Sequence, residues 1–151
     1  MTICSFATIA QTKRNTFGIG FQSSLPVFGL SAKYALNKTS VVQATIAPFS
    51  SGAFGINYFG GRYIYRFESK NNLDPYVYGA VGLVTYSSVI SSALGSKSNS
   101  FGSFGVGGGV EYIAADVLGL SAEIGLGKMS VVDGVGYTGI NMGVGIHYYL
   151  K

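Results

Sequence analysis

The sequence predicts an all-β fold, an eight-stranded antiparallel up-and-down β-barrel that spans a membrane. The first observation is period-two alternation. In FGVGGGVEY (104–112), large apolar residues occupy one face, and glycines with Glu111 occupy the other. The second is that charged residues make up only 11% of the chain, against roughly 25% in an average soluble domain. The third is a mean hydropathy of +0.37 without an apolar run near the ~18–20 residues of a membrane-spanning helix.

The glycine and aromatic content favours the same class. The chain has 23 glycines, 11 tyrosines and 10 phenylalanines, and a glycine inside a helix costs about 1 kcal/mol relative to alanine. The alternative fold is a soluble calycin-like barrel, which would carry many charges outside and apolar residues around an internal pocket. Here the charges are few and share a face with glycine, so an exterior in contact with lipid is favoured.

The first three predicted strands are alternating segments separated by turn residues. They cover residues 16–23, 27–36 and 41–47. The second strand carries Lys33 on the face opposite its large apolar side chains. Residues 37–40 (NKTS) predict a tight turn, and Pro48 with the Ser-Ser-Gly at 50–52 is expected to end the third strand in a loop.

The fourth predicted strand, 53–67, is longer than the others. Its apolar phase changes near Gly60 and Gly61, which predicts a glycine β-bulge at that point. After the bulge, Arg62 and Arg66 alternate with aromatic residues, so both arginines are expected to face the barrel interior.

The last four predicted strands bring the total to eight, an even number. The fifth covers 76–87 and is apolar on both phases, so its outward face stays unassigned; the others start near 100, 118 and 138. Eight membrane strands of ~9–11 residues need about 80 residues, which the chain supplies. The connections expected on the periplasmic side are 37–40, 68–75 and 115–117, and those expected on the outer side are 24–26, 48–52, 88–99 and 128–137.

Five charged residues lie on the phase opposite the large apolar side chains of their own strands. They are Lys33, Arg62, Arg66, Glu111 and Glu123. An arginine facing lipid near the midplane would cost about 2–4 kcal/mol, so the five are expected to form an ionic network inside the barrel, with Asn141 and His147 as further interior polar residues. We interpret this network as a structural plug rather than an ion or proton path, because an eight-stranded barrel is only wide enough for side chains to fill.

The residue inventory argues against metal, cofactor and nucleic-acid sites. His147 is the only histidine, and no Cys or carboxylate is spaced with it as a metal ligand. A catalytic serine–histidine pair would need a serine from another strand, so no catalytic residue is assigned. The net charge of +4 comes from scattered basic residues, unlike the clustered patches of nucleic-acid readers.

The strand pattern resembles that of small outer membrane β-barrels of the OmpA/OmpX-like type. The resemblance covers about residues 16–150 and rests on YVYGAVGL (76–83), FGVGGGVEYIAADVLGLSAEIGLG (104–127) and GVGIHYYL (143–150). It implies a Gram-negative outer membrane location, contact with phospholipid and lipopolysaccharide, and a structural or surface-interaction role without catalysis. Two alternatives stay open: an accessory subunit bound to envelope protein partners, and a lipid-modifying enzyme. The chain ends in Leu150-Lys151, whereas family members end in an aromatic residue.

The chain divides into a lead-in at 1–15 and a barrel domain at 16–151. Residues 1–10 (MTICSFATIA) are interpreted as the tail of a secretory signal peptide, because Thr8-Ile9-Ala10 has the small-x-small form of a cleavage site. The alternative is an ordinary disordered N-terminus. Cys4 is the only cysteine, which excludes an internal disulfide framework.

Overall fold

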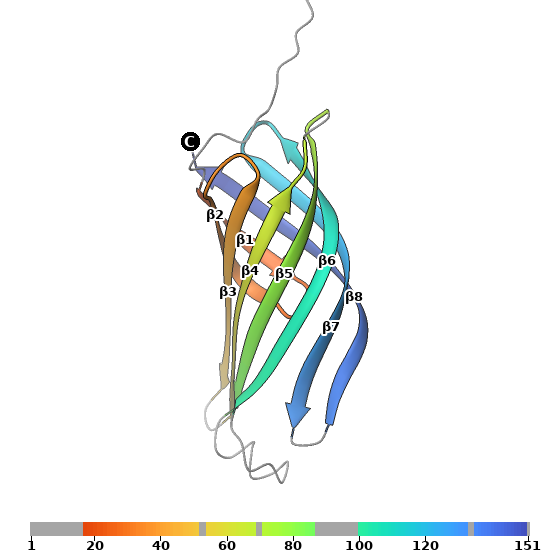
Figure 1. Cartoon of the computed structure of the whole chain (residues 1–151). Helices are drawn as coiled ribbons and strands as arrows, with labels where there is room; N and C mark the ends of the chain where they lie inside the picture. The colour runs from red at the N-terminus through yellow and green to blue at the C-terminus, as the bar shows by residue number, and fades with distance from the viewer. Residues whose placement is uncertain (1–16, 52–53, 69–70, 87–99, 133–134, 151) are drawn as a thin grey trace, which may run out of the picture.

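The barrel is closed, with eight antiparallel strands each hydrogen-bonded to its sequence neighbours and the last paired with the first (Figure 1). A computed structural model describes residues 17–51, 54–68, 71–86, 100–132 and 135–150. The strands are β1 (Phe17–Ser23), β2 (Phe28–Ala35), β3 (Ser40–Ser51), β4 (Phe54–Arg66), β5 (Leu73–Tyr86), β6 (Ser100–Ala114), β7 (Leu118–Val132) and β8 (Val135–Leu150). The predicted eight-stranded antiparallel class is therefore confirmed. The suggested signal-peptide remnant lies outside the described residues.

Within the described part of the chain, no helix has both the length and the apolar character needed to cross a membrane.

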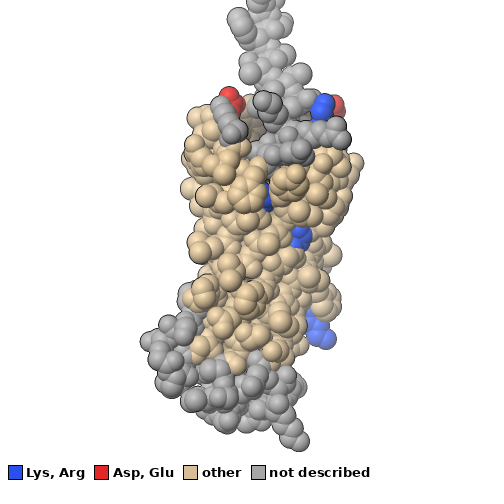
Figure 2. All heavy atoms as spheres, turned by 90° about the vertical axis from the view of Figure 1, so that its left-hand side faces the viewer, with Lys and Arg blue, Asp and Glu red and all other residues tan. Residues whose placement is uncertain are grey.

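The wall has the inverted polarity that the alternation predicts. Large apolar side chains point outward, with Met142 75% and Leu30 63% exposed, while the inward Lys33 is 1% and His147 0% exposed. Figure 2 shows one side of this wall, where acidic and basic atoms are rare. An apolar exterior around polar groups is stable only where hydrocarbon replaces water outside.

Register decides which face of β5 points outward. Tyr78 of β5 pairs with Ile64 of β4, and both are buried, with 4% and 2% of their surface exposed. The alternate residues Val77, Val81 and Leu83 are exposed on the outer face. Pairing with β4, which carries the arginines, thus decides which face of β5 points outward, although both faces of its sequence are equally apolar.

The predicted bulge at Gly60 and Gly61 is wrong. Gly60 pairs with Thr45 on β3 and Gly82 on β5 in continuous register on both sides. The apparent change of phase comes from two adjacent aromatic residues in this strand, one facing inward and one outward. The register shift that the structure does contain lies on β7, between Ser130 and Val132.

The predicted loop at Pro48 is also wrong, because β3 continues to Ser51. Residues of even number on β3 direct their backbone groups toward β2, as the hydrogen bond from the Leu36 N–H to the Ser40 carbonyl shows (2.9 Å). Pairing with β2 ends at Ile46. Pro48 therefore lies on a strand edge, where its missing N–H breaks no ladder.

The other corrections concern the lengths of connections. Strand β5 begins at Leu73, inside the turn predicted at 68–75, and β7 and β8 extend through most of the loop predicted at 128–137. Strand pairing across these segments overrides their turn-forming composition. We call the end of the barrel with Phe17 and Leu150 the terminal end, and the opposite end the far end. The turns after β2, β4 and β6 lie at the terminal end.

The β1–β2 connection folds into the barrel. Pro26 and Val27 are buried completely or nearly so. The turn approaches two wall glycines closely: a Cβ on Gly60 would lie 2.9 Å from Val27 Cγ1, and one on Gly105 would lie 3.0 Å from Pro26 Cδ. The connection thus fills the interior at the level where β1 and β2 end.

The turn between β6 and β7 offers a direct stability test. Ala115 and Asp116 have φ of +49° and +59°, as in the type I′ hairpin turn, which disfavours residues with a Cβ. We expect Ala115→Gly to raise the free energy of unfolding by about 0.5–1 kcal/mol. Urea unfolding in micelles measures this change. The control Ala122→Gly, in extended β7, should lower stability by a similar amount; a lowered midpoint for Ala115→Gly would contradict the turn assignment.

Candidate functional site

Buried charges occupy the part of the interior nearer the terminal end. Among the described residues, six charged residues are buried, and none has more than 6% of its whole-residue surface exposed. They are Lys33, Arg62, Arg66, Asp74, Glu111 and Glu123. Three cations and three carboxylates balance one another, as an interior with little water requires.

Glu111 is the centre of one group, which we call the Glu111 cluster (Lys33, Arg66, Glu111 and Tyr149). Lys33 Nζ lies 2.7 Å from Glu111 Oε1, and Arg66 Nη2 lies 3.1 Å from Oε2. The Tyr149 hydroxyl is 2.9 Å from both carboxylate oxygens and accepts a hydrogen bond from Arg66 Nη2 at 3.1 Å. Both oxygens of this buried carboxylate are therefore paired with cations.

Glu123 is the centre of a second group, the Glu123 cluster (Gln22, Gln43, Arg62, Tyr76 and Glu123). Arg62 Nη1 lies 2.8 Å from each oxygen of Glu123, and the Tyr76 hydroxyl donates to Oε2 at 2.8 Å. The remaining guanidinium donors reach Gln43 Oε1 (2.6 Å) and Gln22 Oε1 (3.0 Å). These contacts join β1, β3, β4, β5 and β7 across the barrel.

His147 faces a serine across an intervening strand. His147 and Ser31 both pair with Gly20 on β1, and because glycine has no side chain, His147 Nε2 comes within 2.8 Å of Ser31 Oγ. His147 is fully buried and Ser31 is 6% exposed. No described residue pairs with His147 Nδ1. The pair therefore lacks the orienting carboxylate and the open access that a hydrolytic site needs.

The structure thus places every residue of the predicted network inside the barrel, and divides the five charges between two clusters. Asn141, also expected inside, is 9% exposed on the inward face of β8.

Two buried interior residues are not predicted by the sequence: Asp74, which lies outside both clusters, and Tyr76 of the Glu123 cluster. Asp74 lies within the turn predicted at 68–75, although extending the alternation back from Tyr76 places both residues on the same face. The inward position of Tyr76 cannot be predicted from the sequence, because its segment is apolar on both faces. Asp74 is 4% exposed and acts electrostatically on Arg66, so it supplies the third carboxylate of the balance.

Close approach explains one glycine of this site. A Cβ on Gly119 would lie 2.8 Å from both Glu111 Oε1 and Tyr149 Cε2. The absence of a side chain at Gly119 therefore leaves room for the Glu111 cluster.

No group of three or more potential metal ligands occurs in the described residues.

Comparison with known proteins identifies similar sequences and folds. The family model described as outer membrane protein beta-barrel domain matches residues 6–148. The N-terminal β-barrel domain of Pseudomonas aeruginosa OprF superposes with a TM-score of 0.65 at 15% identity, covering 91% of this chain and 98% of that one. Neisserial surface protein A gives 0.52 at 18% identity, covering 90% and 93%. Ail of Yersinia pestis gives 0.49 at 17% identity, covering 91% and 100%. No curated protein sequence matches the chain.

Proposed function

The chain belongs to the outer membrane protein beta-barrel family and resides in the bacterial outer membrane, and from this premise we propose that it is a non-conducting barrel with a structural or surface-interaction role. The observation that supports this most directly is the burial of the Arg62–Glu123 pair. Both side chains have 0% exposure, so water does not reach the pair from either end. Ions need a hydrated path, and these side chains lie across it.

Electrical recording tests this proposal. The refolded protein, added to planar lipid bilayers in concentrated KCl, should give no resolved conductance steps. Insertion is checked on the same sample by the faster gel migration of the unboiled barrel and by protease resistance of the strands. Stable, reproducible steps from inserted protein would contradict a closed interior.

The orientation follows from the connections and the aromatic residues. In the proposed orientation the terminal end faces the periplasm, because the longest connection, between Tyr86 of β5 and Ser100 of β6, lies at the far end, and the longer loops of this class of barrel face outward. Five exposed tyrosines lie near that end and suit the membrane interface. They are Tyr34, Tyr63, Tyr65, Tyr112 and Tyr148. Phospholipid would then surround the terminal half of the wall, and lipopolysaccharide the far half.

The buried Ser31–His147 pair is where a catalytic role of the barrel can be tested. Because His147 is fully buried and contacts no described carboxylate, we expect His147→Ala to leave the lipid composition of the envelope unchanged. Mass spectrometry of lipids from cells expressing the native chain or the variant measures this. A lipid species that depends on native His147 would instead support a lipid-modifying enzyme.

A further inference from the structure

The connection between β1 and β2 crosses the barrel interior. We call its residues 24–27 the inserted turn. Strands outside the β1–β2 hairpin each contribute a glycine to the contact with it. These glycines are Gly60 on β4, Gly82 on β5, Gly105 on β6 and Gly143 on β8. A Cβ on Gly82 would overlap the Pro26 carbonyl oxygen, and one on Gly143 would lie 3.0 Å from Ser24 Cα. The inserted turn therefore reaches from its own hairpin to the opposite wall.

Local backbone geometry holds the inserted turn in this position. Gly29 of β2 has a φ of +111°, a conformation that residues with a Cβ rarely adopt. A Cβ there would also overlap the Ile46 carbonyl oxygen on β3, so glycine lets the hairpin bend close to β3. The Ser24 N–H and hydroxyl both donate to the Val27 carbonyl, at 3.3 and 3.4 Å. The inserted turn is therefore closed by its own hydrogen bonds.

Apolar side chains at the end of this hairpin pack against the wall. Leu25 and the neighbouring Phe28 contact a buried apolar cluster. That cluster consists of Ala47, Tyr58 and Val84. Val27, which is 0% exposed, belongs to a second buried cluster that includes Tyr78 and Ala80. An apolar constriction of this kind excludes water and ions.

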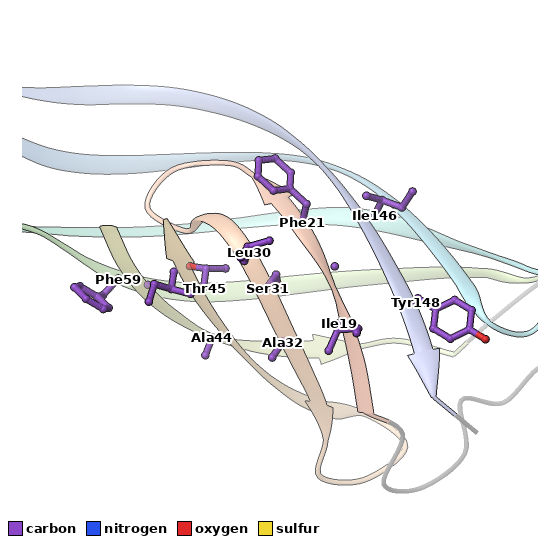
Figure 3. A pocket seen from close by; sticks show the side chains of 13 residues that line it. Ile19, Phe21, Leu30, Ser31, Ala32, Ala44, Thr45, Phe59, Ile146 and Tyr148 are labelled. Atoms are coloured by element: carbon purple, nitrogen blue, oxygen red, sulfur yellow. The ribbon is translucent and has the colours of Figure 1, made fainter. Parts of the chain in front are cut away.

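The large hollow beside the hairpin lies outside the wall. It is a trough of about 950 Å³ on the lipid-facing side, where Phe21, Leu30 and Ile146 are exposed (Figure 3). The pocket next to Leu25 and Pro26 has a volume of only about 10 Å³, which is about the space that one water molecule needs. The inserted turn therefore fills the interior at its level, and hydrated ions do not fit past it.

The inserted turn and the ionic residues occupy successive levels of the same strands. On β4 the turn contacts Gly60, and Arg62 is the next inward residue toward the terminal end. On β6 it contacts Gly105, and Glu111 lies farther toward the terminal end. An ion that enters from the far end therefore meets the apolar turn before it reaches the Arg62–Glu123 pair.

From this arrangement we propose that the inserted turn is a second seal, which closes the barrel on the far-end side of the ionic clusters and independently of them. The Arg62–Glu123 pair closes the interior by pairing buried charges, whereas the inserted turn closes it by an apolar constriction that excludes water. The two seals lie in series, so the loss of either one leaves the barrel closed. This inference goes beyond the proposed function, which rests on the ionic pair.

Cysteine accessibility along β5 tests the position of this seal. A cysteine is introduced at Ala80 or at Tyr86 in a Cys4→Ser background, and each refolded protein is treated in micelles with a charged methanethiosulfonate. Gly82, which contacts the inserted turn, lies between these two positions. Tyr86→Cys should react, because Tyr86 is only partly buried. Ala80→Cys should stay unreacted, because the seals enclose it and reagents reach a buried thiol slowly. Equal reactivity at both positions would overturn the proposal.

A shortened hairpin tests whether the inserted turn forms this seal. Asn-Gly in place of residues 24–27 leaves a short hairpin loop, and Ala80→Cys should become reactive in this variant. The matched control places Asn-Gly at 37–39, at the other end of β2, and should leave Ala80→Cys unreacted. Gel mobility of the unboiled proteins checks folding, and Val27→Gly, which keeps the chain length, takes the place of a shortened hairpin that does not refold. Continued protection of Ala80→Cys in the folded turn variant, or its loss in the control, would contradict the proposal.

Conductance recording of the same proteins separates this inference from the proposed function. The shortened hairpin should give no conductance steps, because the Arg62–Glu123 pair remains in place. Steps from the native chain would contradict the proposed function. Steps from the shortened hairpin alone would show that the ionic pair does not seal the interior, and would contradict two seals in series.

Discussion

Replacing Arg62 with leucine is expected to lower the free energy of unfolding by about 3–5 kcal/mol, because it leaves a buried carboxylate without its cation. Glu123 receives two contacts of 2.8 Å from Arg62 Nη1, and both side chains are fully buried. After the substitution the only remaining donor to Glu123 among those described is the hydroxyl of Tyr76. The amides of Gln22 and Gln43 also lose the guanidinium that they contact.

Urea unfolding in lipid vesicles, followed by the heat-modifiable gel band, measures this loss. The double variant Arg62→Leu/Glu123→Leu should recover much of the stability, since apolar residues of similar volume can replace a buried ion pair. Lys38→Leu, in the exposed β2–β3 turn, is the control and should change stability by no more than about 0.5 kcal/mol. An unfolding midpoint of Arg62→Leu equal to that of the native chain would refute a stabilising interior network.

Replacing Glu111 with leucine is expected to be at least as damaging, about 3–5 kcal/mol, because two buried cations lose one shared carboxylate. Lys33 and Arg66 are 1% and 3% exposed, so neither reaches water without local unfolding. Tyr149 would also lose the acceptor of its hydroxyl hydrogen bonds. Much of the protein is expected to refold poorly.

The folded fraction after dilution from urea, read from unboiled gel mobility, measures the effect of Glu111→Leu. Adding Lys33→Met should restore part of the folded fraction, because it removes one of the two unpaired cations while keeping a similar volume. Glu111→Gln should fall between the native chain and Glu111→Leu, since its amide oxygen still accepts one hydrogen bond. A folded fraction for Glu111→Leu that matches the native chain would contradict the Glu111 cluster.

The two faces of each strand could be read from the sequence because facing is a local property. Successive side chains point to opposite sides whatever the rest of the chain does. The inward positions of Lys33, Glu111 and Glu123 followed from their neighbours alone. The same logic failed in β5, where both phases are apolar, and it missed Asp74, which lies beside turn residues.

The partners of these inward residues could not be read in the same way. Glu111 meets Lys33, 78 positions away, and Glu123 meets Arg62, 61 positions away. Which of these residues meet across the interior depends on the number of strands, their tilt and their stagger around the closed barrel. No single segment of the sequence encodes these properties. The approach of Ser31 to His147 is of the same kind, since it requires a glycine on the strand between them.

By itself, the sequence determined the class of protein: alternation, scarce charge and inward glycines specify a barrel with lipid outside and polar groups within. Only the tertiary structure decided how that barrel is closed and filled. The local sequence at Pro48 predicts the end of a strand, yet β3 continues past it. The short β1–β2 hairpin leaves this edge of β3 unpaired, so the missing N–H of Pro48 breaks no hydrogen bond. The inward fold of the β1–β2 connection at Pro26 and Val27 has the same origin. The physical reason is that facing is set by the geometry of neighbouring residues, whereas closure is set by how strands of unequal length meet around a ring.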